Sequence, residues 1–341
     1  FGHFRGGLSY VNVISNMLLA SIMGSANAQA AMMSKVLVPE MERQGYKKEF
    51  SAALTVSASL IGPIIPPSLI FILYAVIAEV SVGKMFLAGV IPGILLGIAF
   101  IILISIISVK QNFPVHEKAA FRERVVAFIE VFPSLLIPVI IVFGILTGAF
   151  TAIESAGIGC LLAFIIGKFI YRELKWKDLP KIFVNTAVNT SIVTFIIVMA
   201  TIFAYVLSIE RIPQTVAGAL ISLTDNPYIF LLICVILFLL VGLVLEPMAA
   251  MIILIPVLLP VAVSYGVDPI QFGIMICINL TIGMITPPVG TALFITSSIT
   301  KVKVEALTVA TLPFLIAAIL VLLIITYIPE LTLWLPKFVS K

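Results

Sequence analysis

The stretch "IGPIIPPS", Ile61–Ser68, interrupts a long apolar run with one glycine and three prolines. The same device returns as "IGMITPPV", Ile282–Val289, inside another apolar run. Proline removes a backbone N–H and clashes with the preceding helical turn, so neither run can be one continuous helix. The sequence therefore predicts two apolar helices, each broken at a matching motif.

Composition identifies the solvent around these helices. Hydrophobic residues make up 62% of the 341 residues and charged residues 11%, whereas soluble domains carry about 25% charged residues. Apolar runs of about 20 residues recur along the chain, as a helix needs to cross a bilayer, and they lack the alternation of barrel strands. The cysteines lie in such runs without metal-ligand spacing and are predicted to be small buried apolar side chains: Cys160, Cys234 and Cys277. We therefore predict an all-α integral membrane protein.

Hydropathy and helix-breaking residues together predict seven crossings. They cover residues 50–79 (broken), 84–109, 126–147, 151–171, 186–208, 270–300 (broken) and 306–328. Two further apolar segments, 8–41 and 227–265, are interrupted midway by "GSANA" (Gly24–Ala28) and "LEPM" (Leu245–Met248), and each is predicted to form a re-entrant hairpin. Residues 209–225 are too polar to cross and are predicted to lie along the interface as an amphipathic arm.

The distribution of positive charge supports this topology. Lysine and arginine collect in cytoplasmic loops, and the four loops on one predicted side carry fourteen of them against four on the other side. The net charge of +4 is explained by these loops and does not indicate nucleic-acid binding. The same topology makes the two hairpins enter from opposite sides and point at each other.

The two broken helices belong to a longer internal repeat. Gly62 and Gly283 are 221 positions apart, and the same offset relates Pro39 to Pro260 and Gly45 to Gly266. The offset also aligns the two hairpin interruptions, placing Ser25 on Glu246. Because an odd number of crossings separates the matched positions, the copies are predicted to be inverted in the membrane. Inverted repeats with paired broken helices are typical of secondary transporters.

Broken backbone inside a membrane has a physical consequence. Unpaired amides and carbonyls are tolerated only where protein or a water-filled cavity surrounds them. Glycine at each break permits close approach and unusual dihedrals. Each Pro-Pro leaves upstream carbonyls free to bind a cation. Each new half-helix can direct its positive end at an anion. We therefore predict that the two breaks form the binding site.

Five motifs together resemble the large membrane subunit of TRAP (tripartite ATP-independent periplasmic) transporters, in order and over essentially the whole chain. They are "GHFRGGLSYVNV" (Gly2–Val13), "GSANAQAA" (Gly24–Ala31), "IGPIIPPS", "TAIESAG" (Thr151–Gly157) and "ITPPVG" (Ile285–Gly290). The family's first helices would precede Phe1.

The resemblance implies a function and partners. It implies sodium-coupled uptake of organic acids such as C4-dicarboxylates or sialic acid, and an elevator in which hairpins and broken helices move against a scaffold. It implies a bacterial inner membrane location, with a small membrane subunit and a periplasmic substrate-binding protein as partners.

Two sodium sites are expected from this resemblance, one in each repeat, built from the oxygen ligands that a hard cation prefers. The predicted sodium ligands are Ser25, Gly62, Ile65 and Pro67 in the first repeat, and Glu246, Gly283, Thr286 and Pro288 in the second. The predicted substrate residues between the hairpin tips are Asn27, Ser57, Ser59, Asn279 and Thr291. The alternative for these five is that their polar groups are bonded within or between helices.

Two glutamates have different predicted roles. Glu246 is the only carboxylate predicted near the bilayer midplane, where an ionisable group is costly and usually functional. Its structural alternative is to cap the second half-helix of its hairpin. Glu154 follows Thr151 in the T-x-x-E pattern of a capping box, and a structural role is predicted for it.

The predicted organisation has four parts. Residues 1–79 and 227–300 form the two transport-domain repeats, each with a re-entrant hairpin and a broken helix. Residues 80–226 supply scaffold helices, connecting helices and the amphipathic arm, and residues 301–341 a C-terminal scaffold helix.

Other functional classes fit the residues less well. An intramembrane protease is disfavoured because the aspartates lie in predicted loops and neither His3 nor His116 is placed to activate a buried serine or bind zinc; no enzymatic activity is predicted. A stand-alone divalent-anion/sodium symporter of the same architecture remains an alternative. A channel is less favoured, since broken-helix inverted repeats indicate alternating access.

Overall fold

The computed structural model describes residues 4–110, 113, 121–212, 215, 218–219 and 224–339. Every regular element in these segments is helical, so the predicted all-α class is confirmed for the described part of the chain.

The first repeat begins with a helical hairpin and continues into the first broken helix. Its helices are α1 (Gly7–Met23), α2 (Ala26–Arg43), α3 (Lys48–Ala58), a short 3₁₀ turn (Ser59–Ile61) and α4 (Leu69–Ile77). Helix α5 (Val82–Lys110), the first of the predicted scaffold helices, follows it. Helix α1 ends at Gly24, whose φ of 59° is left-handed, and Ser25 caps α2. The predicted interruption at "GSANA" therefore separates the two helices of the hairpin.

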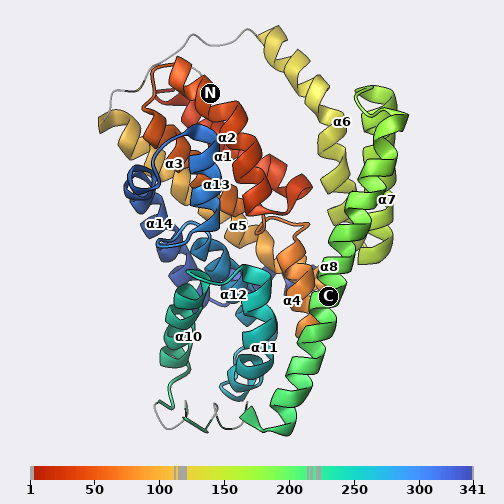
Figure 1. The fold of residues 1–341 in the computed structure, drawn as a ribbon, viewed down its shortest axis with the longest axis vertical. Coiled ribbons are helices and arrows are strands. Elements are labelled where there is room, and N and C mark those ends of the chain that lie inside the picture. The colour runs from red at the N-terminus through yellow and green to blue at the C-terminus, as the bar shows by residue number, and fades with distance from the viewer. Residues whose placement is uncertain are drawn as a thin grey trace.

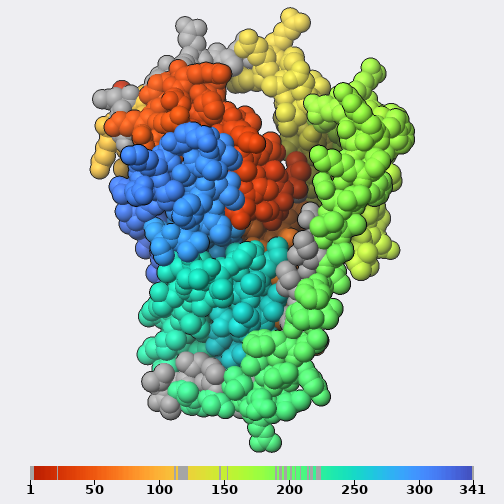
Figure 2. All heavy atoms as spheres, in the orientation of Figure 1, coloured from red at the N-terminus to blue at the C-terminus, as the bar shows by residue number. Residues whose placement is uncertain are grey.

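The middle of the chain forms a separate group of helices along one side. They are α6 (Phe121–Leu146), α7 (Ala152–Ile165) with a π-helical extension (Ile166–Ile170), a short 3₁₀ turn (Trp176–Asp178) and α8 (Leu179–Ile209). The predicted capping box is confirmed: Thr151 Oγ1 accepts from the Glu154 amide at 3.2 Å, and Glu154 Oε2 accepts from the Thr151 amide at 2.8 Å. Figure 2 shows this group, yellow to green, beside the rest of the molecule.

The second repeat follows the same order. Its helices are α10 (Pro227–Gly242), α11 (Pro247–Ser264), α12 (Pro269–Gly283) and α13 (Thr291–Thr300). The C-terminal part of the chain adds α14 (Val304–Tyr327) and α15 (Glu330–Val339). Helix α12 is buried throughout residues 271–283 and packs against α10, α14 and α11. It therefore runs through the hydrophobic core.

The 221-residue offset is visible in the backbone. Helix α2 spans Ala26–Arg43 and α11 spans Pro247–Ser264, so both bounds repeat at the offset. Both helices end in the same reverse turn, with left-handed glycines at Gly45 (φ 88°) and Gly266 (φ 78°). The next amides, of Tyr46 and Val267, bond back to carbonyls five residues earlier at 3.1 and 3.0 Å. The two copies therefore share local geometry where their side chains differ.

The two hairpins lie in opposite halves of the molecule. Figure 1 shows α1 and α2 in the upper half with α13 beside them, and α10 and α11 in the lower half with α12 beside them. A hydroxyl–carbonyl hydrogen bond of 2.6 Å joins Tyr74 in α4 to Pro269 at the start of α12. The two repeats thus interlock in one core.

Long apolar helices agree with most of the predicted crossings. Within the described segments, five helices are long and apolar enough to cross a membrane. Four of these correspond to predicted unbroken crossings, and the fifth is α11, the second half of a predicted hairpin. About half of the predicted arm at 209–225 lies outside the described residues.

Two expectations need correction. Helix α15 was not predicted, because its ten residues are too few to cross a membrane. It packs on α5 with Thr332, Leu333 and Pro336 buried, while Trp334 and Phe338 are exposed. Cys160 is exposed on α7, whereas Cys234 and Cys277 are buried as expected. Cys160 faces away from the packed interior because α7 contacts the rest of the protein on one side only.

Candidate functional site

The first break is a hydrogen-bonded turn between the 3₁₀ turn that follows α3 and the start of α4. The carbonyl of Ile61 accepts from the amides of Ile64 and Ile65, both at 3.0 Å. The Ser68 hydroxyl donates to the Pro63 carbonyl and also caps the new half-helix α4. Side-chain and backbone hydrogen bonds therefore hold the turn in one shape.

Three predicted ligands in this turn have unpaired carbonyls. In the described part of the chain, no hydrogen bond reaches the carbonyl oxygens of Gly62, Ile65 and Pro67. An unpaired carbonyl in an apolar interior is costly unless a donor or cation satisfies it. These groups therefore fit the oxygen donor set expected of a sodium site.

The tip of the first hairpin packs on this turn. A β-carbon placed on Gly24 would lie 3.5 Å from the Pro67 carbonyl oxygen. The next residue, Ser25, is half-buried, and its hydroxyl oxygen accepts from the Ala28 amide at 3.4 Å as the cap of α2. The structure thus brings Ser25 and Pro67 into one region.

Glycine at the two breaks serves close packing. Gly62 has helical dihedrals (φ −51°, ψ −57°), and Gly283 lies within helix α12; unusual backbone angles, expected from the sequence, are therefore absent at both. A β-carbon on Gly62 would collide with Gln29 Oε1, and one on Gly283 would lie 2.6 Å from the Gly242 carbonyl oxygen. Each break glycine thus lets the adjacent hairpin approach closely.

The second break has the same outline but different bonding. The Gly283 carbonyl accepts from the Thr286 amide at 3.0 Å, unlike its unpaired counterpart Gly62. The Thr286 hydroxyl donates to the Ile282 carbonyl at 2.8 Å, which leaves its oxygen lone pairs available. No hydrogen bond to the Thr286 and Pro288 carbonyls occurs in the described segments.

The second hairpin tip and the second break enclose a small cavity of about 10 Å³, roughly the size needed for one water molecule. Its walls come from both elements: Gly242, Leu243, Val244, Leu245, Glu246, Pro247, Met284, Val289, Gly290 and Thr291. Glu246 therefore lies beside the second break, as the repeat predicts.

Glu246 is the N-cap of α11. Its Oε2 accepts from the amides of Met248 and Ala249 at 2.9 and 3.4 Å, and Ser25 occupies the matching position in α2. The capping alternative for Glu246 is thus what the geometry shows. Its other oxygen, Oε1, accepts no hydrogen bond from the described residues, so a cation role stays a prediction.

The two repeats meet through their predicted substrate residues. Thr291, at the start of α13, donates to Asn27 Oδ1 at 3.3 Å. Ser34 and Thr296, two turns and one turn further along α2 and α13, are also hydrogen-bonded, at 3.4 Å. Asn27 and Thr291 thus lie together at the junction of hairpin and broken helix.

The other predicted substrate residues are buried and bonded within the protein. The hydroxyls of Ser57 and Ser59 donate to carbonyls about one turn back, at 2.7 Å each. Asn279 donates to the Val235 carbonyl at 2.9 Å, while its Oδ1 is buried without a partner. Their role in substrate binding stays a prediction.

Sequence reasoning missed a row of buried polar side chains behind the first break: Asn12, Asn16, Gln29 and Thr55. The i, i+4 spacing of Asn12 and Asn16 inside an apolar segment was an available signal, since it places both amides on one helix face.

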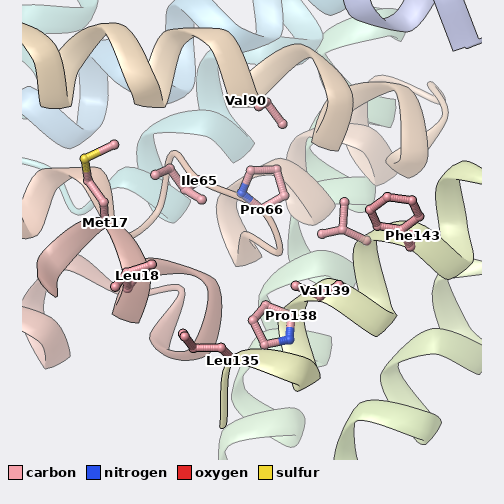
Figure 3. A pocket seen from close by; sticks show the side chains of 10 residues that line it. Met17, Leu18, Ile65, Pro66, Val90, Leu135, Pro138, Val139 and Phe143 are labelled. Atoms are coloured by element: carbon pink, nitrogen blue, oxygen red, sulfur yellow. The ribbon is translucent and has the colours of Figure 1, made fainter. Parts of the chain in front are cut away.

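A larger apolar pocket of about 420 Å³ lies between the first break and α6 (Figure 3). Its lining includes Met17, Ile65, Pro66 and Pro138. Without a polar group to hold an anion, this pocket does not fit an organic acid. The Ile65 side chain lines it, whereas the Ile65 carbonyl is the group predicted to bind the cation. In the described residues, no cluster of three or more His, Cys, Asp or Glu side chains is arranged to hold a metal ion.

Comparison with known proteins agrees with this architecture. Residues 1–331 match the family described as "Tripartite ATP-independent periplasmic transporter, DctM component". The C4-dicarboxylate TRAP transporter large permease protein DctM of Pseudomonas aeruginosa is 38% identical over 99% of this chain and 79% of its own length. The sialic acid TRAP transporter large permease protein SiaM of Vibrio cholerae is 35% identical over 98% of this chain and 79% of its own length.

A third relative, the isethionate TRAP transporter permease protein DctMQ of Oleidesulfovibrio alaskensis, is 37% identical over 98% of this chain and 53% of its own length. These relatives are permease subunits and not enzymes, which confirms the prediction that excluded enzymatic activity. The chain is a multi-pass membrane protein and belongs to the DctM family of TRAP transporter large permeases.

Proposed function

We propose that this protein is the permease subunit of a sodium-coupled, binding-protein-dependent secondary transporter that imports an organic acid. One observation carries the proposal: two matched helix breaks each have a hairpin tip packed on them, and Asn27 of the first hairpin is hydrogen-bonded to Thr291, directly after the second break. This arrangement gathers backbone oxygens for cations and half-helix N-termini for an anion at one place.

The substrate class follows from the relatives and from the charge of the region. The relatives' names specify C4-dicarboxylate, sialic acid and isethionate, which are all acids. The sequence predicts no lysine or arginine at the level of the breaks, so helix N-termini, bound sodium and polar side chains would hold the acid group. Asn27 and Thr291 are the polar groups best placed for this role.

The transport step is proposed to be an elevator movement. The two repeats interlock through contacts such as Tyr74–Pro269, which suits a core that moves as a unit. Helices α6 to α8 lie beside this core (Figure 1), and the apolar span of α6 is only 6% buried within the chain. We assign them to a fixed scaffold in the bacterial inner membrane, where a small membrane subunit would cover them and a periplasmic binding protein would deliver substrate.

The test is uptake by proteoliposomes that contain this chain, its small subunit and the binding protein. An inward sodium gradient should drive accumulation, and Ser25→Ala and Thr286→Ala should each raise the sodium concentration for half-maximal uptake. Uptake that does not depend on the sodium gradient would contradict the proposed sodium coupling. Uptake that needs no binding protein would favour the stand-alone symporter instead.

A further inference from the structure

A line of hydrogen-bonded side chains runs from the buried end of α3 to the first break. The Thr55 hydroxyl donates to the Ser51 carbonyl at 2.7 Å. Asn12 donates to Thr55 at 2.7 Å, Asn16 to Asn12 at 2.8 Å, and Gln29 to Asn16 at 2.7 Å. We call Thr55, Asn12, Asn16 and Gln29 the amide relay; each of the four is fully buried.

The orientation of the side-chain amides of Asn16 and Gln29 is fixed by backbone carbonyls, and that of Asn12 by Thr55, whose hydroxyl already donates to the Ser51 carbonyl. Gln29 Nε2 also donates to the Asn16 carbonyl at 2.7 Å, and Asn16 Nδ2 to the Asn12 carbonyl at 2.8 Å. A backbone carbonyl can only accept, so neither amide can be turned over without placing two acceptors against each other. Every donor in the relay therefore points away from the break.

The relay consequently ends in an unused acceptor at the break. Gln29 Oε1 is buried and has no hydrogen-bond partner, and it faces the α-carbon of Gly62 so closely that a β-carbon there would collide with it. Hydrogen bonds in a chain polarise one another, which increases the negative charge on this terminal oxygen. A buried acceptor of this kind is costly unless a donor or cation completes it.

Three features of the surroundings favour a cation. Ser25 lies one turn before Gln29 on α2, joined to it by a backbone hydrogen bond of 3.0 Å. The unpaired carbonyls of Gly62, Ile65 and Pro67 lie in the adjacent turn. All of these groups supply oxygen, the ligand that sodium prefers.

The relay is confined to the first repeat. The 221-residue offset places Ile233, Leu237, Ala250 and Ile276 at the positions of Asn12, Asn16, Gln29 and Thr55. The second repeat therefore cannot form an equivalent row, and it carries the carboxylate of Glu246 where the first repeat has Ser25. The two sites differ in kind, one built around a neutral amide and the other beside a charged carboxylate.

We propose that Gln29 Oε1 is a side-chain ligand of the cation held at the first break, and that Asn16 and Asn12 are positioning residues that hold this oxygen in place. This inference rests on the proposed sodium coupling and extends it to residues outside the broken helices. It also gives a reason for glycine at position 62, since any side chain there would displace the ligand.

The experiment compares Gln29→Met with Gln271→Met in the complex of this chain with its small subunit. Methionine keeps the length and approximate volume of glutamine but removes the amide. Gln271 is a matched control, because it is also buried and donates one hydrogen bond, to the Thr326 carbonyl at 3.0 Å, away from both breaks. The measurements are the sodium dependence of thermal unfolding, with choline chloride holding ionic strength constant, and the sodium dependence of uptake.

We expect Gln29→Met to raise the sodium concentration for half-maximal effect about tenfold or more, as the loss of one interaction with a charged group predicts. Gln271→Met should lower the unfolding temperature and leave the sodium dependence unchanged. Gly62→Ala, which displaces Oε1 without removing it, should act like Gln29→Met and serves as the second variant if Gln29→Met does not fold.

The outcomes separate this inference from the proposed function. A sodium-dependent wild type with equal dependence in Gln29→Met, or in Gly62→Ala where Gln29→Met does not fold, would overturn the ligand assignment alone and would indicate that a water molecule completes Oε1. A wild type without sodium dependence would overturn both proposals.

Discussion

The Thr291 hydroxyl donates a hydrogen bond to Asn27 Oδ1 across 3.3 Å, although the two residues are 264 positions apart. Asn27 belongs to the first hairpin and Thr291 to the second broken helix. This bond therefore lies where the positive ends of α2 and α13 approach each other.

Thr291→Val should weaken substrate binding. The change keeps the shape of the side chain and removes the hydroxyl, whose hydrogen bond contributes about 0.5–1.5 kcal/mol. We expect a rise of about two- to tenfold in the substrate concentration for half-maximal uptake, measured at saturating sodium. Thr296→Val is the control, because it loses a similar link to Ser34 one turn further from the break. Equal effects of the two changes would indicate a structural bond only.

Gly283→Ala should destabilise the protein strongly. Its β-carbon would lie 2.6 to 2.8 Å from the carbonyl oxygen, carbon and α-carbon of Gly242, and backbone atoms cannot rotate away. Overpacking of this kind costs about 1–3 kcal/mol, which should lower the unfolding temperature in detergent. Gly157→Ala on α7 is the control, since no atom lies within 4 Å of its β-carbon and alanine favours a helix. An unchanged unfolding temperature for Gly283→Ala would contradict the close approach of hairpin and break.

Glu246→Ser separates the two roles of this carboxylate. Serine is an effective N-cap and occupies the matching position, Ser25, in the first repeat. The substitution should therefore preserve the unfolding temperature while removing the charge beside the second break. We expect a higher sodium concentration for half-maximal uptake, whereas Glu246→Ala should lose both the cap and the charge. Wild-type sodium dependence in Glu246→Ser would leave Glu246 as a cap only.

Cysteine labelling should show that the repeats are inverted. Cys160 is exposed and Cys234 and Cys277 are buried, so Cys160→Ser supplies a background of low reactivity. In this background Lys47→Cys and Lys303→Cys should react only from the cytoplasmic side. Ser264→Cys, at the base of the second hairpin, should react only from the periplasmic side. Reaction of Lys47→Cys and Ser264→Cys from one side would refute the inverted arrangement.

Much of the fold could be predicted because proline, glycine and apolar length act locally. The helix ends near Gly24, Gly62 and Gly283 follow from such signals, and so does the capping box of Thr151. Helix α15 was not predicted because its burial depends on packing against α5, and this contact leaves no local pattern in the sequence.

The candidate site was less predictable because its details depend on contacts between distant segments. The repeat placed Ser25 and Glu246 at equivalent positions, but their shared capping role required the geometry. Gln29 could not be assigned from its own surroundings in the sequence, since its significance comes from the approach of Gly62. Glycine at that position was expected to permit both close approach and unusual backbone angles; the close approach is confirmed, and the dihedrals are helical.

The hydrogen bond from Tyr74 to the Pro269 carbonyl also bears on how the protein is made. Tyr74 is synthesised 195 residues before its hydrogen-bond partner Pro269. Asn27 is synthesised 264 residues before its partner Thr291. The first broken helix must therefore be inserted with its buried hydroxyl unsatisfied, a costly state in lipid. Water, an insertion factor or another membrane segment has to satisfy this hydroxyl until the segment containing Pro269 is inserted. The first half of the protein is therefore most prone to misfolding in the interval between the insertion of the two halves.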